Sequence, residues 1–119
     1  MTRIIIHGCN GAMGHAVEEL AAADAQIEIA AGIDRETGKQ RSFPVYTSWE
    51  ACGAEADVVV DFSTAAATDA LLDACTKRKL ALVLCTTGLS KEQLAHVEEA
   101  AREIPILRSG NMSLGINLL

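Results

Sequence analysis

Three glycines at a predicted strand–helix junction constrain the fold of this sequence more than any other feature. Gly8, Gly11 and Gly14 are spaced three residues apart and follow the run RIIIH of residues 3–7, which predicts a buried strand. Apolar residues then recur at helical spacing and predict a helix, with a stripe formed by Met13, Ala16, Val17, Leu20 and Ala21. Glycine permits a sharp turn and a close approach of the backbone, so we expect a tight β–α turn here.

Apolar runs and helical patterns alternate along the rest of the chain. Five further strands are predicted, at residues 27–34, 43–47, 57–63, 80–85 and 104–109. Helices are predicted at about 64–79, at a weak turn over 48–54, and after Ser90, which forms a capping box with Gln93. Pro44 makes the run 43–47 an expected edge strand. The alternation predicts an α/β Rossmann fold, a doubly wound and mostly parallel sheet, in a single domain over residues 1–119.

Charge and cysteine spacing exclude several classes of function. The net charge of −6 disfavours nucleic acid and anionic membranes as partners, and no apolar run approaches the length of a membrane span. The four cysteines do not have the spacing of metal ligands, so we expect free thiols in a reducing cytoplasm and no metal site.

The glycine junction predicts a binding site for the diphosphate of a dinucleotide. Gly8 would allow the turn, Gly11 would let a phosphate approach the backbone, and Gly14 would let the helix pack closely. The N–H groups and the dipole at the helix start bind an anion without any basic side chain. The GxxGxxG spacing differs from the more familiar GxGxxG, and a tight turn without a ligand is the alternative.

Two charged residues at the end of the second predicted strand suggest how a nucleotide would be held. Asp34 follows Gly14 by 20 residues, and a carboxylate there can accept hydrogen bonds from an adenosine ribose. Arg35 can stack on adenine or pair with a 2′-phosphate. The carboxylate of Asp34 favours NAD(H) and Arg35 tolerates NADP(H), so the two residues together predict the use of both cofactors. A solvated turn is the alternative interpretation of each residue alone.

The loops after the predicted strands converge at one edge of a parallel sheet, where ligands bind. The crevice is expected between the first strand and the strand that ends at Phe62. Hydroxyl and amide groups would lie where a nicotinamide binds: Ser63, Thr64, Thr86, Thr87 and Asn111. Helix capping is the alternative role of these hydroxyls, and we expect it for Thr64.

Four stretches together resemble one known family. They are IIIHGCNGAMG, VVVDFSTAAATDAL, VLCTTGLSKEQL and ILRSGNMSLGINLL, and they span essentially all 119 residues. In this order they resemble the N-terminal domain of bacterial 4-hydroxy-tetrahydrodipicolinate reductase (dihydrodipicolinate reductase), an enzyme of lysine and diaminopimelate biosynthesis. The resemblance implies an NAD(P)H-dependent reduction of a heterocyclic dicarboxylate. Cys85 stands where the family usually has glycine, and Met112 stands where phenylalanine is commoner.

The resemblance also implies roles for individual residues. Six residues of the first loop would wrap the diphosphate: Gly8, Cys9, Asn10, Gly11, Ala12 and Met13. Asp34 and Arg35 would hold the adenosine ribose and any 2′-phosphate. Two later loops would contact the nicotinamide ribose and ring through Cys85, Thr86, Thr87, Ser109, Gly110, Asn111 and Met112. Thr87 would in addition contact the substrate.

The family's substrate-binding and catalytic domain, with its His-rich helix and lysine, has no counterpart in this chain. We expect His7 and His15 to pack on a helix or lie on the surface, with contact to a phosphate as the alternative because both flank the glycine loop. We expect His96 to lie on the surface, so none of the three is a predicted catalytic residue. The chain is therefore expected to bind nucleotide without turning over substrate. The family implies a tetramer for the full-length protein and is compatible with a monomeric fragment. Alternatives are the cofactor half of another nicotinamide oxidoreductase and a non-catalytic dinucleotide- or CoA-binding module.

Overall fold

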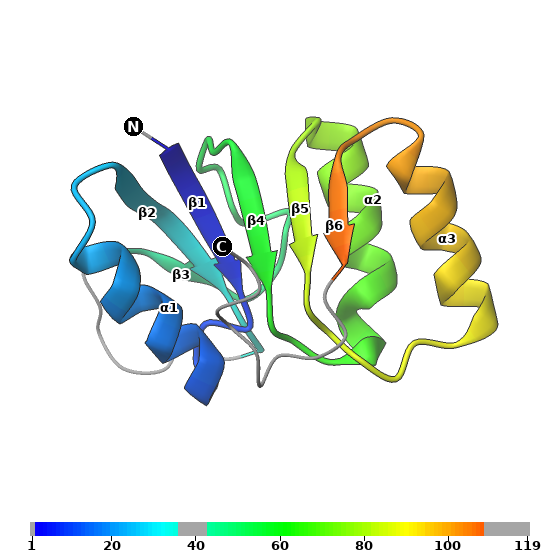
Figure 1. Ribbon diagram of the computed structural model, residues 1–119, viewed down its shortest axis with the longest axis horizontal. Coiled ribbons are helices and arrows are strands. Elements are labelled where there is room, and N and C mark those ends of the chain that lie inside the picture. The colour runs from blue at the N-terminus through cyan, green and yellow to red at the C-terminus, as the bar shows by residue number, and fades with distance from the viewer. Residues whose placement is uncertain (1, 36–42, 109–119) are drawn as a thin grey trace.

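The computed structural model describes residues 2–35 and 43–108. Six parallel strands form one sheet in the order β3-β2-β1-β4-β5-β6 (Figure 1). The strands are β1 (Thr2–His7), β2 (Ile27–Ile33), β3 (Val45–Tyr46), β4 (Val58–Asp61), β5 (Ala81–Leu84) and β6 (Ile106–Arg108). The predicted α/β fold is confirmed, and β3 is an edge strand as Pro44 indicated. Because β1 pairs with both β2 and β4, the chain reverses its winding direction at β1, where the crevice was expected.

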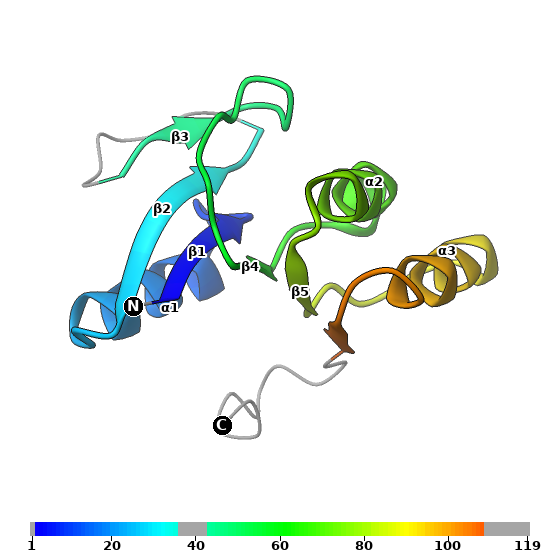
Figure 2. The ribbon, with the colours of Figure 1, turned by 90° about the horizontal axis from the view of Figure 1, so that it is seen from above.

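Helices cover the two faces of the sheet. Helix α1 (Ala12–Ala22) lies on one face, and α2 (Thr68–Arg78) and α3 (Lys91–Ala101) lie on the other (Figure 2). The side chains of β1 alternate between these layers, since Ile4 and Ile6 pack in the core beneath α1 whereas Ile5 belongs to the core beneath α2 and α3. The layers position the carboxyl ends of all six strands at one edge.

Helix α1 docks by a face that differs from the predicted apolar stripe. Gly14 and Ala21 are buried and Val17 is half-buried, but Met13 is 38% and Leu20 71% exposed. A β-carbon at Gly14 would lie 2.7 Å from backbone atoms of Cys9, so Gly14 must lie where α1 approaches the loop most closely. This close contact determines which face of α1 packs against the rest of the domain.

The helical turn predicted over 48–54 is a single turn at residues 49–51, closed by a hydrogen bond of 3.1 Å from Cys52 N to the Trp49 carbonyl, and it does not extend into a helix. The guanidinium of Arg78 in α2 donates hydrogen bonds to the backbone carbonyls of Trp49 and Cys52. The Trp49 carbonyl thus accepts hydrogen bonds both from within the turn and from Arg78, so a residue distant in sequence helps to hold this segment.

The two later helices begin close to their predicted positions. Ser90 and Gln93 form the predicted capping box of α3. A 3₁₀ turn, Ala65–Ala67, precedes α2, and Thr64 occupies its N-cap position without a side-chain hydrogen bond, so capping by that hydroxyl is wrong.

His96 lies half-buried at the surface, between α2 and α3, and has partners that the sequence did not predict. Its side chain is 25% exposed, and its ring nitrogens lie 2.7 Å from Asp69 Oδ1 and 3.0 Å from Asp73 Oδ1. Hydrogen bonding to Asp69, followed by hydrogen bonding to Asp73 and the charge of both carboxylates, raises the pKa of His96 against the opposing effect of burial. The contacts join the two helices that cover this face.

All four cysteines are free, as the spacing predicted, and the structure shows that all four are also buried. Within residues 2–35 and 43–108, no group of three potential metal ligands comes together. In the same part of the chain, none of the helices has the length and apolar character needed to cross a bilayer.

Candidate functional site

The glycine loop between β1 and α1 has the geometry that its spacing predicts. Gly8 has a φ of +87°, and a β-carbon there would lie 2.8 Å from the backbone carbonyl of Phe62. Gly14 admits the close contact with Cys9 described above. A β-carbon at Gly11 would meet only the Gly8 oxygen, at 3.6 Å, so Gly11 faces open space. Two glycines therefore shape the loop, and the third leaves room beside it.

Helix α1 begins in this open space without a side-chain cap. Gly11 is the N-cap residue, and the first turn carries no acidic side chain. The N–H groups at a helix start lack intrahelical partners and lie at the positive end of the helix dipole. This arrangement suits an anion such as a diphosphate.

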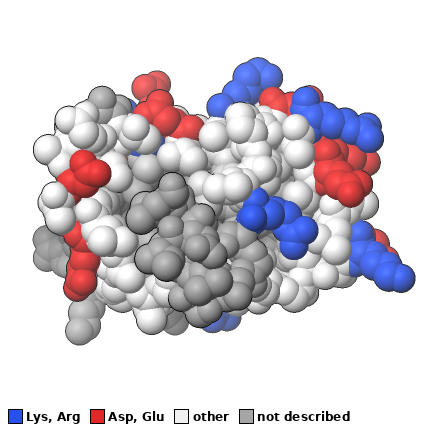
Figure 3. All heavy atoms as spheres, in the orientation of Figure 1, with Lys and Arg blue, Asp and Glu red and all other residues white. Residues whose placement is uncertain are grey.

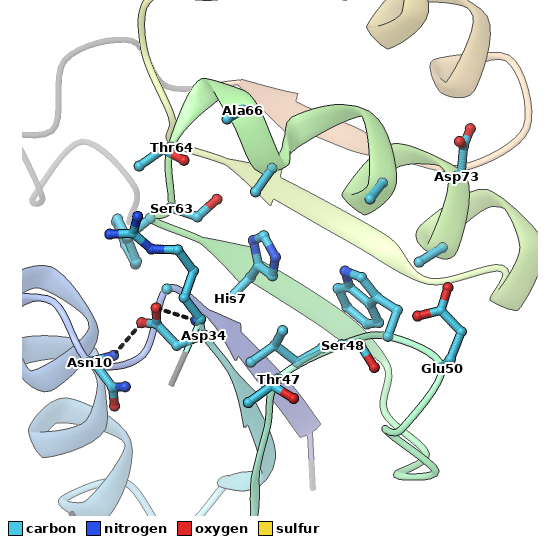
Figure 4. Close-up of a pocket in the computed structure, with 18 of the residues that line it drawn as sticks. His7, Asn10, Asp34, Thr47, Ser48, Glu50, Ser63, Thr64, Ala66 and Asp73 are labelled. Atoms are coloured by element: carbon cyan, nitrogen blue, oxygen red, sulfur yellow. Dashed lines mark hydrogen bonds between the residues drawn. The ribbon is translucent and has the colours of Figure 1, made fainter. Parts of the chain in front are cut away.

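Asp34 lies beside the glycine loop, as the dinucleotide hypothesis requires. Its Oδ2 accepts a hydrogen bond of 2.9 Å from the backbone N–H of Asn10, and its Oδ1 accepts one of 2.7 Å from Arg35 N (Figure 4). The carboxylate is half-buried and Arg35 is exposed at the mouth of the same cavity. Both side chains can thus meet a ligand seated on the loop.

A cavity of about 920 Å³ extends from the glycine loop along the face of the sheet that α2 covers. Gly8, Asn10, Gly11, Asp34 and Arg35 line one end. Small apolar side chains line the wall formed by the 3₁₀ turn and α2: Ala66, Ala67, Ala70 and Ala74. The volume falls in the range of small-molecule and cofactor sites.

Charged side chains are dispersed over the face of the molecule shown in Figure 3. Acidic groups lie along the left of this view, separate basic groups lie at the top and on the right beside further acidic groups, and the described residues form no continuous basic patch on this face. Because the whole chain carries a net charge of −6, an anionic ligand depends on local backbone donors.

Asp61, at the end of β4, is the centre of a buried polar network. It is 0% exposed and accepts hydrogen bonds from Ser63 N at 3.1 Å, from Ser63 Oγ at 2.6 Å and from Thr86 Oγ1 at 2.5 Å. Nδ1 of His7 lies 2.8 Å from Oδ1 of the same carboxylate. Burial acts to raise the pKa of Asp61, but hydrogen bonding from His7, Ser63 and Thr86 and the charge of His7 together hold it below its ordinary value. The carboxylate is therefore the ionised form.

His7 is 5% exposed, so the expected surface position is wrong, whereas packing against a helix is compatible with its place opposite the α2 side chains that line the same cavity. Its ring stacks on that of Trp49, with centroids 5.7 Å apart and an interplanar angle of 23°. Arg78 lies 5.5 Å from the centroid of the same indole. Sequence reasoning did not assign a role to Asp61, Trp49 or Arg78. The alternation of side chains along β1 could have predicted the burial of His7, since it places His7 on the same face of the sheet as Ile5.

The loop after β5 has buried and exposed parts. Cys85 and Thr86 are buried and Thr87 is exposed. Burial, and then the charge of Asp61, raises the pKa of the Cys85 thiol to about 11, so this thiol stays protonated. The Thr86 hydroxyl donates to Asp61 and does not face the cavity as a free group.

The remaining predicted site residues differ in position. The side chain of Cys9 is 0% exposed in the core beneath α1, which leaves only its backbone to contact a ligand. Ala12 and Met13 lie exposed in the first turn of α1. Four predicted contacts lie outside the described residues: Ser109, Gly110, Asn111 and Met112.

Comparisons with known proteins agree with this geometry. The family model described as "Dihydrodipicolinate reductase, N-terminus" matches residues 2–112. Proteins named 4-hydroxy-tetrahydrodipicolinate reductase from Caldanaerobacter subterraneus subsp. tengcongensis and Clostridium tetani are 52% and 44% identical over 119 residues, which is 100% of this chain and 47% of each relative. The chain thus spans about half the length of these relatives.

Solved structures share the fold. A dipicolinate-bound dihydrodipicolinate reductase from Paenisporosarcina sp. TG-14 has a TM-score of 0.83 at 22% identity, over 99% of this chain and 50% of that one. A homoserine dehydrogenase from S. aureus has a TM-score of 0.75 at 17% identity, over 94% of this chain and 33% of that one. The family match over 2–112 and the identity to the curated relatives show that the chain belongs to the family of dihydrodipicolinate reductase N-terminal domains.

Proposed function

We propose that this chain is the cofactor-binding half of a reductase that converts 4-hydroxy-tetrahydrodipicolinate to tetrahydrodipicolinate with NADH or NADPH. The observation that carries the proposal is the uncapped start of α1 at Gly11, which opens into the same cavity as Asp34. Family membership and the named relatives support the reaction. The rest of the full-length protein would supply the proton and most substrate contacts.

The residues of this chain fit a dinucleotide. The loop from Gly8 to Met13 would surround the diphosphate. Because the N–H groups of Gly8, Asn10 and Gly11 donate to partners within the protein, the N–H groups of Ala12 and Met13 at the start of α1 would bind it. Asp34 would accept hydrogen bonds from the adenosine ribose. Arg35, exposed at the cavity mouth, would pair with a 2′-phosphate where one is present. The loop 85–87, together with 109–112, would contact the nicotinamide end, and Thr87 would reach the substrate. When bound, the cofactor supplies the hydride.

The only tryptophan of the chain provides a direct assay, because Trp49 lines the cavity. Reduced nicotinamide absorbs where indole emits, so titration with NADH or NADPH should quench Trp49 fluorescence saturably. Asp34→Ala should weaken NADH binding about tenfold, which is about 1.4 kcal/mol, while Glu98→Ala on the exposed face of α3 serves as the matched control. Arg35→Ala should weaken NADPH more than NADH. Absence of a saturable signal with either nucleotide would contradict the proposal.

Contacts at the nicotinamide end of the site distinguish the two hypotheses, a reductase half and a non-catalytic nucleotide-binding module. Hydrogen exchange should show protection of residues 85–88 by NADH but not by ADP-ribose, because only NADH carries the nicotinamide. Equal protection by both ligands would favour the module.

A further inference from the structure

The loop after β5 is held by a single hydrogen bond beyond the end of the sheet. Pairing of β4 with β5 ends at Asp61, whose carbonyl accepts a hydrogen bond of 3.1 Å from Cys85 N. Within the part of the chain that the structure describes, residues 86–89 form only one hydrogen bond, from Thr86 Oγ1 to Asp61 Oδ2 at 2.5 Å. At the other end of the loop, Leu89 packs on the core beneath α2 and α3. The course of the loop between these points therefore depends on the contact of Thr86 with Asp61.

This contact is of a strong kind. Asp61 is 0% and Thr86 6% exposed, and hydrogen bonds to an ionised carboxylate are about twice as strong as those between neutral groups. The Ser63 hydroxyl and Nδ1 of His7 lie at the other oxygen, Oδ1, so Thr86 does not share its acceptor with either of them. The Thr86 hydroxyl is thus paired within the protein and is not available to a ligand.

The two residues that follow Thr86 form the tip of the loop, and they are open. Thr87 and Gly88 are exposed, and a β-carbon at Gly88, which has a φ of +76°, would meet nothing within 4 Å. At Oδ1 of the same carboxylate, Ser63 holds the segment after β4, which lines the cavity. Asp61 therefore fixes the tip of the loop after β5 relative to a wall of the cavity.

We propose that the hydrogen bond between Asp61 and Thr86 holds the tip of this loop against the nicotinamide of the bound dinucleotide. The proposal rests on the proposed function, because it requires a nicotinamide at this end of the site. The resemblance implies that Thr86 itself contacts the cofactor, whereas the geometry gives that contact to Thr87 and Gly88. Asp61 and Thr86 are thus positioning residues, and a loop that they hold in place loses less conformational freedom when the ligand binds.

The test measures the affinity of the 119-residue chain for NADH and for ADP-ribose by calorimetry, because ADP-ribose lacks only the nicotinamide. The wild type should bind NADH about tenfold more tightly. Thr86→Val keeps the shape of the side chain and removes the hydroxyl, so this variant should bind the two ligands within about twofold of each other. Thr86→Ser retains a hydroxyl and should retain the preference.

Two further variants separate positioning from direct contact and from stability. Asp61→Ala removes the acceptor and leaves the Thr86 hydroxyl, so it should lose the preference only if Thr86 acts through Asp61. Thr76→Val removes a hydroxyl that donates to the Leu72 carbonyl within α2 and does not line the cavity, so it should keep the preference. Loss of stability alone weakens both ligands equally and leaves the ratio of their affinities unchanged.

A measurement without ligand covers the case in which Asp61→Ala does not fold. The NMR order parameters of the Thr87 and Gly88 amides should fall in ligand-free Thr86→Val and stay unchanged in Thr86→Ser. Unchanged order parameters in Thr86→Val, or a preference for NADH that persists in Thr86→Val or in Asp61→Ala, would overturn the positioning role alone. Equal affinity of the wild type for both ligands, or binding of neither, would overturn the proposed function as well.

Discussion

Replacing Gly14 and Gly11 by alanine separates the structural from the binding role of the glycine loop. At Gly14 the new β-carbon would lie 2.7 Å from the Cα and O atoms of Cys9 and from the Gly8 oxygen. All three neighbours are backbone atoms, which cannot swing aside as the end of a flexible side chain does. Gly14→Ala therefore forces the loop and α1 apart.

The expected loss of unfolding free energy in Gly14→Ala is the difference between two opposing effects. Alanine in a helix interior is favoured over glycine by about 1 kcal/mol, and forcing an extra methyl group into a packed site costs about 1–3 kcal/mol. Since three contacts are violated at once, we take the upper end, and Gly14→Ala should lose about 2 kcal/mol of unfolding free energy. Gly11→Ala meets only one atom at ordinary contact distance, and the poorer N-cap preference of alanine should cost only about 0.5–1 kcal/mol of unfolding free energy.

Urea unfolding followed by circular dichroism measures the loss of stability in Gly14→Ala, and NADH titration measures the loss of affinity in Gly11→Ala. Gly11→Ala should remain stable and lose about tenfold in NADH affinity, because its methyl group occupies the space proposed for a phosphate. The reasoning fails if Gly14→Ala unfolds at the wild-type urea concentration. It also fails if Gly11→Ala binds NADH as tightly as the wild type does.

Three other predictions follow from described contacts. The carboxylates of α2 raise the pKa of His96 above 6.5, so the stabilisation by His96 is full below pH 6.5 and is lost as the pH rises through the raised pKa. His96→Gln should therefore lower the urea midpoint more at pH 5.5 than at pH 8.5. Arg78→Met removes two hydrogen bonds to backbone carbonyls and should cost about 2–3 kcal/mol of unfolding free energy, whereas Lys77→Met on the same helix should cost less than about 0.5 kcal/mol. Burial and a pKa of about 11 at Cys85 should leave that thiol unreactive toward iodoacetamide at pH 8 until urea unfolds the chain; rapid native labelling would contradict the buried environment.

The strand order was predictable because it depends on short-range patterns and on chain handedness. Each apolar run became a strand, and parallel strands joined by right-handed crossovers leave few arrangements. The position of Asp34 beside the loop was predictable for the same reason, since β2 must end at the edge where the loop lies. The buried face of α1 was not, because it depends on the single close contact at Gly14 and not on apolar spacing.

The turns at 48–54 show the limit of local reasoning more clearly. A helical turn was expected there, and the hydrogen bond from Cys52 N to the Trp49 carbonyl closes one, but Arg78, which is 26 residues beyond Cys52, also donates to the carbonyls of this segment. Such a contact leaves no signal in a window of neighbouring residues. The same turns bring Trp49 against His7, so a missed tertiary contact also concealed one wall of the candidate site.

Asp34 and Asp61 illustrate how burial assigns different roles to similar residues. Each lies at the end of an apolar strand run next to β1, yet Asp34 is half-buried and held by backbone N–H groups beside the cavity, while Asp61 is 0% exposed. The partners of Asp61 come from the end of β1 and from the loop after β5. One carboxylate therefore ties three adjacent strand ends together through charge-assisted hydrogen bonds. This link fixes the glycine loop relative to the loop 85–88, the spacing on which simultaneous contact with both ends of a dinucleotide would depend.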